Sequence, residues 1–293
     1  MGGVLKMYLT AKSIIEEKNL LDKRRKGAKN IELHLVVGDV YDKRQVQTQL
    51  ITLKNSKMEI VSVHAPIERI CTLEGSMSKS GFDLLDNTCY LAQKIADYRG
   101  KNIDIVLHHE LDYEQLMMWE LMDKIADEIN VLLIRYKNVV INIENLMNMC
   151  SDKGDIYFAN SYVQSNIDIC ENLRKYLRTN RVGVVVDICH ILASSKILGK
   201  LDEYKEQLDL EDILINSREY LNIVHLANSR GIGFRDGHGC GFDTDKEREK
   251  LRFIIDTLKE IEFKGSLVLE VGELNYLDSI EFEKLFKQVN NLI

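Results

Sequence analysis

The sequence is poor in the residues that interrupt or cross-link a chain. Its 293 residues contain one proline, Pro66, and no tract of glycine and serine. Nothing in the composition therefore marks a linker, and we expect one domain over residues 1–293. The six cysteines include no CxxC pair, which argues against a cysteine-type structural zinc site and for small buried side chains.

Long apolar runs and an excess of basic residues are also absent. No stretch approaches the roughly 18–20 apolar residues of a membrane span, and the first residues, MGGVLKMYLTAKS, lack the apolar run of a signal peptide. Lys and Arg number 39 against 46 Asp and Glu, a net charge of −7. No overall basic field indicates a polyanionic partner, although a local basic rim would not show in the total. We expect a cytoplasmic protein without a membrane partner, and the sequence points to no protein partner.

What the sequence does contain is a regular alternation of two kinds of segment. Short β-branched or aliphatic runs predict strands at residues 7–11, 30–36, 58–64, 102–108, 138–144, 181–187, 221–226 and 266–271. Longer amphipathic stretches between them predict helices, including residues 13–27, 83–100, 113–136, 166–179 and 245–261. Such alternation indicates an α/β fold with a parallel sheet, and eight repeats close into a (β/α)8 TIM barrel. An open doubly wound sheet is the alternative, but it would not gather residues from six strand ends around one point.

Side chains that bind metals lie at or just after the ends of successive predicted strands. They number nine, and they include five of the seven histidines: His64, His108, Glu144, Asp187, His190, His225, Asp236, His238 and Glu270. A strand buried in a barrel should be continuously apolar, so an ionisable residue at its last position needs a reason. Because all strands of such a barrel end at one face, the nine side chains should converge there and share a metal site.

The types of donor atom limit which metal ions could bind. Imidazole nitrogens with carboxylate oxygens suit zinc, manganese or iron, and nine candidates exceed what one tetrahedral ion uses. Two or three ions bridged by a carboxylate fit the count. His34 is expected to face the core or a helix, and His109 should point away from His108. Glu32, on the same side of its strand as His34, is a possible carboxylate of the pocket.

The motifs that carry these residues resemble those of the endonuclease IV family, the metal-dependent apurinic/apyrimidinic endonucleases. RVGVVVDICHILA resembles the sixth-strand motif of that family, and VHAP, LHH, IEN, HL, DGH and LE resemble its other ligand motifs in the same order. The resemblance spans roughly residues 60–271. It implies the fold of the wider xylose isomerase-like superfamily, which also includes sugar isomerases and epimerases.

The resemblance also implies how the ligands divide among up to three zinc ions, with manganese or another divalent metal as alternatives. His64 and His108 would hold the first ion, and Glu144 would bridge it to the second. Asp187, His225 and Glu270 would complete the second, and His190, Asp236 and His238 would hold the third. We assign Glu144, Asp187 and Glu270 as catalytic, and Glu32, Asn145 and Arg235 as substrate-binding.

Three functions follow from this pattern. The leading one is a metal-dependent phosphodiesterase that cuts duplex DNA at abasic sites, with a rim formed by Lys43, Arg44, Arg69, Lys79, Lys196, Arg230 and Arg235. The second is a sugar isomerase or epimerase that uses the subset Glu144, Asp187, His225 and Glu270, and the acidic charge and the IELHL strand favour it. The third is a barrel that binds metal without catalysis, since fold alone does not settle chemistry.

Overall fold

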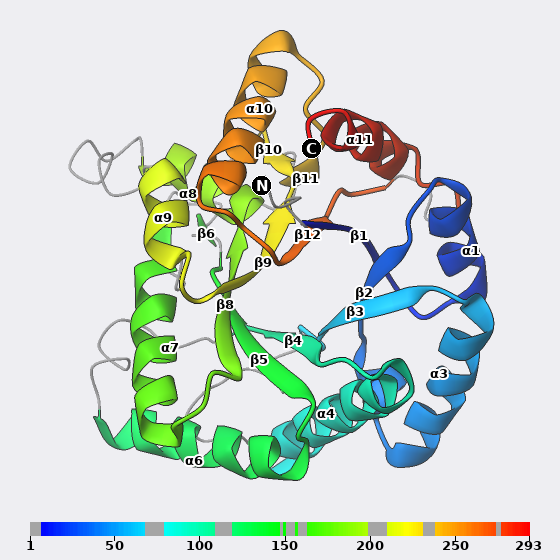
Figure 1. Ribbon diagram of the computed structural model, residues 1–293, viewed down its shortest axis with the longest axis vertical. Helices are drawn as coiled ribbons and strands as arrows, with labels where there is room; N and C mark the ends of the chain where they lie inside the picture. Colours follow the sequence, from blue (N-terminus) through cyan, green and yellow to red (C-terminus); the bar gives the residue numbers. More distant parts are fainter. Residues whose placement is uncertain are drawn as a thin grey trace, which may run out of the picture.

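Eight parallel strands close into a barrel in the computed structural model of this chain (Figure 1). The structure describes residues 7–67, 79–108, 119–146, 149–150, 156–157, 163–198, 210–230, 238–273 and 277–293. Around the barrel the strands follow their order in the sequence, and the last pairs with the first. In chain order they are β1 (Tyr8–Ser13), β2 (Asn30–His34), β3 (Glu59–His64), β4 (Ile103–Leu107), β5 (Val139–Glu144), β8 (Val182–Asp187), β9 (Leu221–Leu226) and β12 (Ser266–Leu269).

Helices surround the barrel on its outside (Figure 1). Those described are α1 (Glu17–Arg25), α2 (Val37–Val40), α3 (Lys43–Ser56), α4 (Lys79–Arg99), α6 (Trp119–Arg135), α7 (Val163–Leu177), α8 (Ile188–Leu198), α9 (Leu210–Ser217), α10 (Asp245–Glu260) and α11 (Ile280–Asn290). The main apolar core lies between these helices and the outward-facing side chains of the strands. Among the described residues, no helix has the length and apolar character needed to cross a membrane.

The inside of the barrel is layered because side chains alternate along a strand with a period of two. Val106, Val185, Ile223 and Val268, from four different strands, form a small buried cluster of their own. Two residues further along the same strands come His108, Asp187, His225 and Glu270. One apolar layer therefore lies beneath a layer of metal-type side chains.

A polar layer closes the opposite end of the barrel. Asn222 Nδ2 donates to Asn142 Oδ1 at 2.6 Å, and Asn142 Nδ2 donates to Asp104 Oδ1 at 2.9 Å. A Cβ atom at Gly183 would lie 2.2 Å from Asn222 Nδ2, so glycine is required for these amides to meet. Burial raises the pKa of Asp104 to about 6 despite the hydrogen bond from Asn142.

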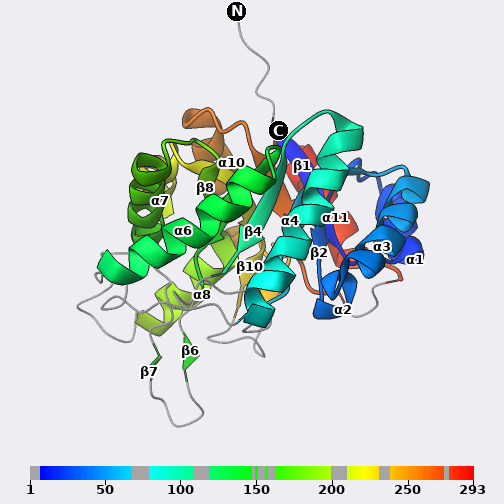
Figure 2. The same cartoon turned by 90° about the horizontal axis from the view of Figure 1, so that it is seen from below.

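The prediction of a (β/α)8 barrel is confirmed, and each of the eight expected strands is present with ends shifted by at most two residues. The expected helices at 13–27, 83–100, 113–136, 166–179 and 245–261 correspond to α1, α4, α6, α7 and α10. Two short antiparallel ribbons were not expected: β6 (Met149–Cys150) with β7 (Ile156–Tyr157), and β10 (Asn228–Ser229) with β11 (His238–Cys240). With α2 and α8, the β6–β7 ribbon lies at one end of the barrel (Figure 2).

Candidate metal centre

Six of the nine predicted ligands come together at the carboxyl ends of the barrel strands. They form two groups whose donor atoms lie within 4.8 Å of one another: His64, His108 and Glu144, and Glu144, Asp187, His225 and Glu270. Five of the six stand at the last position of a barrel strand or directly after it, and His225 is the last residue but one of β9. Convergence follows from the parallel topology, because side chains up to 206 residues apart reach one point.

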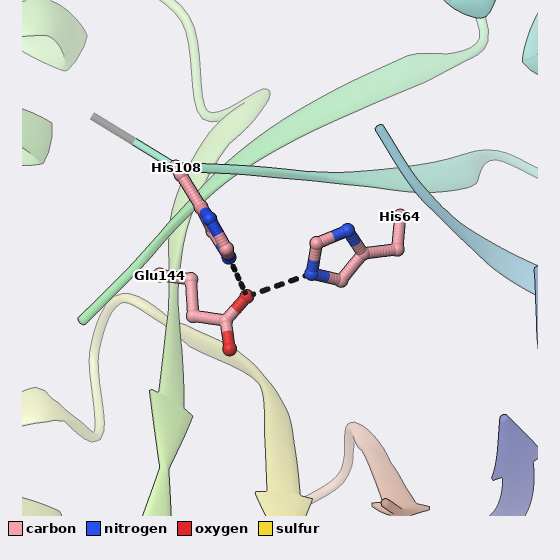
Figure 3. A group of neighbouring side chains, drawn as sticks. All are labelled: His64, His108 and Glu144. Atoms are coloured by element: carbon pink, nitrogen blue, oxygen red, sulfur yellow. Dashed lines mark hydrogen bonds and ion pairs between the residues drawn. The ribbon is translucent and has the colours of Figure 1, made fainter. Parts of the chain in front are cut away.

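Glu144 is common to both groups and joins them. Its Oε2 lies 3.0 Å from His64 Nε2 and 3.0 Å from His108 Nε2 (Figure 3). Its Oε1 lies 3.0 Å from His225 Nδ1. Burial alone would raise the pKa of Glu144, but the attraction of His225 and His108 holds it well below its usual range. A carboxylate that presents one oxygen to each group can bridge two cations.

A buried oxygen without a partner and a crowded imidazole nitrogen indicate that the donor set fits a metal. Asp187 Oδ2 is buried and has no hydrogen-bond partner among the described residues. His225 Nδ1 lies 2.8 Å from Glu270 Oε2 and 3.0 Å from Glu144 Oε1, so two carboxylates face one ring nitrogen. An unsatisfied buried carboxylate oxygen is costly, and divalent cations are the partners that oxygen and imidazole donors share. The residues present therefore suit one or two ions of the zinc or manganese type.

The histidines are oriented by groups behind them, which the sequence did not identify. His225 Nε2 lies 3.0 Å from Glu32 Oε1, and Ser62 Oγ donates to Glu32 Oε2 at 2.8 Å. His64 Nδ1 lies 2.9 Å from the carbonyl oxygen of Ala65. A partner on one ring nitrogen fixes the ring and leaves the other nitrogen for a metal. Glu32, predicted to bind substrate, is fully buried and faces His225.

The proposed third ligand group is described only in part. His190 and His238 lie with ring centroids 5.2 Å apart, and His190 Nδ1 is 2.7 Å from the carbonyl oxygen of Asn145. Asp236 and Arg235 lie outside the described residues. Asn145, predicted to bind substrate, accepts from the backbone N–H of Asp187 at 2.7 Å and donates to its carbonyl oxygen at 3.2 Å. The structure therefore places Asn145 as a support for Asp187, and its contact with substrate stays a prediction.

Two further residues at the site differ from the predictions made from the sequence: Lys12 was not predicted, and His34 was predicted to lie elsewhere. Lys12, at the end of β1, donates to Glu270 Oε1 at 2.6 Å, and its Nζ lies 3.9 Å from Glu32 Oε1. Burial opposes its charge, but Glu270, Glu32 and Glu144 raise its pKa above the usual range. His34 was expected to face the core or a helix. That was wrong: its ring centroid lies 5.3 Å from that of His64, it lines the pocket beside the metal ligands, and burial lowers its pKa to about 4.

The basic rim is only partly described. The Arg230 guanidinium lies 2.6 Å from Asp243 Oδ2 and 2.9 Å from Glu247 Oε1, so its charge is paired within the protein. Lys43 Nζ lies 5.4 Å from the ring centroid of Tyr90, and Arg44 is exposed. Arg69 lies outside the described residues, and the side chains of Lys79 and Lys196 are not described.

A comparison with known proteins places this geometry in a family. A family model described as the xylose isomerase-like TIM barrel matches residues 25–285. A protein of Mycoplasmopsis agalactiae named probable endonuclease 4 is 23% identical over 170 residues, which cover 58% of this chain and 54% of that relative. The chain thus spans about half the length of this relative.

Solved structures of two kinds share the fold. A D-allulose 3-epimerase from Methylomonas sp. superposes with a TM-score of 0.64 at 10% identity, covering 98% of both chains. An AP endonuclease of family 2 from Brucella melitensis superposes with a TM-score of 0.58 at 13% identity, covering 94% of this chain and 97% of that one. At such identities the likeness shows the fold alone.

Proposed function

The chain belongs to the xylose isomerase-like TIM barrel family, and on that basis we propose that it is a metal-dependent phosphodiesterase that hydrolyses duplex DNA at abasic sites. The observation that carries the proposal is the position of Glu144. Its two oxygens face separate donor groups, His64 and His108 on one side and His225 on the other. A single-metal isomerase site has no need of the first group.

The chain's own residues divide the work of the proposed reaction. Zinc or manganese ions bound here would lower the pKa of a water molecule and neutralise charge on the phosphate. Glu144 is common to the two donor groups, and Asp187 and Glu270 each place a carboxylate oxygen within 4.8 Å of the donor atoms of Glu144 and His225. Glu32 fixes the ring of His225. No nucleophilic side chain is required, because the attacking group is water.

Relatives that are similar to this chain in sequence have names that agree with this proposal. The Mycoplasmopsis agalactiae protein and a second relative, from Buchnera aphidicola, are both named probable endonuclease 4. The partner would be abasic duplex DNA, held by those basic residues around the mouth that are not paired within the protein. Binding of such a duplex should weaken steeply with salt, because neutralised phosphates release counterions.

A sugar isomerase or epimerase is the second candidate, and a specific group of residues favours it. Glu144, Asp187, His225 and Glu270 form a complete set of four donors without the remaining histidines. Two of these carboxylates could transfer protons at the carbon next to a carbonyl group. The epimerase from Methylomonas sp. shares this fold, but its identity with the chain is too low to extend its substrate to this protein.

Two measurements separate the candidates. The first is elemental analysis of metal per chain, where two to three ions favour the phosphodiesterase and one favours the isomerase. The second is cleavage of a duplex with one abasic site, in zinc or manganese, beside a panel of ketose and aldose sugars. Sugar turnover without cleavage would replace the hydrolase with the isomerase. Metal binding with neither activity would leave a non-catalytic barrel.

A further inference from the structure

A pocket of about 340 Å³ adjoins the metal ligands and is not used by the proposed hydrolysis. It is enclosed by the end of β1, by α1, by the end of β2 and by the segment after β12, and both Glu270 and His238 line it. Gly239 and Gly272 form one wall, where Gly272 N donates to Gly239 O at 2.7 Å. Glu270 also belongs to the second donor group, so the pocket and the metal centre share this residue.

Two lysines of this pocket are almost buried, which is unusual for lysine. Lys12 and Lys23 expose 12% and 7% of their side chains. Lys23 Nζ lies 3.8 Å from Glu273 Oε1 and 4.4 Å from the centroid of the Phe282 ring. Lys12 Nζ lies 2.6 Å from Glu270 Oε1. Each ammonium group therefore has a carboxylate of the pocket beside it, and Lys12 Nζ also lies 3.9 Å from Glu32 Oε1.

Metal binding would change the balance of charge between the lysines and the carboxylates of the pocket. Glu270 belongs to the second donor group, so its negative charge would be shared with a divalent ion. The charge of the bound ion must itself be counted in the local field. With Glu270 shared with the ion, Lys12 loses part of the negative charge nearest its ammonium group, and that group becomes available to an incoming anion.

The pocket also contains polar atoms that lack a partner. Asn19, on the same face of α1 as Lys23, donates through Nδ2 to Glu16 Oε2 at 3.0 Å. Its Oδ1 and the Nδ1 of His34 are buried, and neither has a hydrogen-bond partner among the described residues. Leaving such atoms unsatisfied costs free energy that a ligand with hydroxyl groups would recover.

We propose that this pocket is a phosphate subsite of the metal centre, in which Lys12 and Lys23 bind a phosphate group of the substrate and Asn19 and His34 hydrogen-bond hydroxyl groups beside it. The inference rests on the proposed metal-dependent function, because a bound metal would draw the charge of Glu270 away from Lys12. The phosphate has two possible sources, a diester of a DNA strand or a monoester on a small sugar.

The test is titration calorimetry of inorganic phosphate into the metal-loaded full chain and its variants. Lys23→Gln removes one charge of the pocket, and Asn19→Asp adds an opposing charge at almost unchanged volume. We expect each to weaken phosphate binding at least tenfold, and Lys23→Arg to restore most of it. Lys26→Gln is the matched control, since Lys26 is the C-cap residue of the same helix and pairs with Asp278 outside the pocket. It should bind phosphate as the unmodified chain does.

Metal content and thermal unfolding of each variant show that the fold and the metal centre are retained. The inference is overturned if folded, metal-loaded Lys23→Gln and Asn19→Asp proteins bind phosphate with unchanged affinity, because phosphate would then contact the metals alone. Competition with ribose 5-phosphate and with an undamaged oligonucleotide identifies the source of the phosphate.

Failure of the subsite is distinguishable from failure of the proposed function. Lys23-dependent phosphate binding without cleavage of abasic duplex would keep the subsite and refute the hydrolase. Cleavage without Lys23-dependent binding would keep the hydrolase and refute the subsite.

Discussion

Individual side chains decide whether this barrel can hold more than one ion. Glu144 contributes an oxygen to each of the two donor groups, whereas every other member serves one. His190 belongs to neither group, although its Nδ1 lies 3.6 Å from Asp187 Oδ2 and 3.9 Å from Glu144 Oε1, and its ring lies against that of His238. Substitution of Glu144 and substitution of His190 should therefore release different amounts of metal.

Replacing Glu144 by Gln should release more than one equivalent of metal and abolish hydrolysis, because the substitution removes the charge that both groups share. His190→Ala should release mainly the ion of the third group. Metal per chain, measured by elemental analysis after gel filtration, distinguishes the two. Similar small losses from both variants would contradict the assignment of Glu144 as the bridge.

Glu32 should act on the metal through His225. Removing a carboxylate that orients a ligating histidine typically lowers metal affinity by roughly 10–100-fold. We expect Glu32→Gln to do so, and Ser62→Ala, which removes only the hydroxyl that donates to Glu32, to have a smaller effect. Competition with a chromogenic chelator measures both affinities. Equal affinity in Glu32→Gln and the unmodified chain would show that Glu32 has no such role.

Among the helices and strands, the start of one helix is hydrogen-bonded to the ribbon that carries His238. The α10 helix begins with a capping box in which Thr244 accepts from Glu247 N and Glu247 accepts from Thr244 N. Glu247 also bonds to Arg230, which follows β10, so the helix start and the β10–β11 ribbon are joined. The bonds from Arg230 and the capping N–H groups hold the pKa of Glu247 near 2.

Thr244→Ala should destabilise the protein by about 0.5–2 kcal/mol, the usual cost of losing an N-cap hydroxyl. Thr244→Ser, which keeps the hydroxyl, serves as the control. Urea unfolding followed by circular dichroism gives the free energies. Since the substitution leaves every proposed ligand in place, metal content should not change. An unaltered free energy of unfolding in Thr244→Ala would mean that the cap contributes nothing.

In the molecule as a whole, carboxyl groups at the two ends of the barrel have pKa values that are shifted in opposite directions. The carboxyl end gathers carboxylates whose pKa values lie below the usual range, whereas Asp104 at the opposite end has a pKa raised to about 6 by burial. Because the folded chain binds the Asp104 proton more tightly than the unfolded chain, stability should fall as pH rises from about 4 to about 6.

Asp104→Asn should remove this part of the pH dependence while keeping an oxygen to accept from Asn142. Relative to the unmodified chain, the variant should gain about 1–3 kcal/mol in free energy of unfolding between pH 4 and pH 6. Comparing the two proteins after metal removal isolates Asp104 from the metal ligands, which titrate in both. Parallel curves across this window would show that the carboxyl group of Asp104 is not buried in solution.

The fold and the candidate ligands could be predicted from the order of residues along the chain. Strand and helix periodicity are local, so the eight strands could be placed from runs such as VGVVVD and LNIVHL, and parallel topology then required their carboxyl ends to meet. Metal-type residues at those ends stand out against the apolar strands, which is why the convergence of six side chains distant in sequence could be predicted.

The groups that surround the ligands could not be predicted in this way, because they come from separate strands of the closed barrel. Lys12 was missed because its strand was ended at residue 11 and lysine is not a metal ligand, and His34 was misplaced because a single histidine gives no sign of which side of a strand it occupies. The roles of Glu32 behind His225 and of Asn145 beside Asp187 depend on contacts between separate strands. Such contacts are set by how the barrel closes, and no local pattern of residues records that geometry.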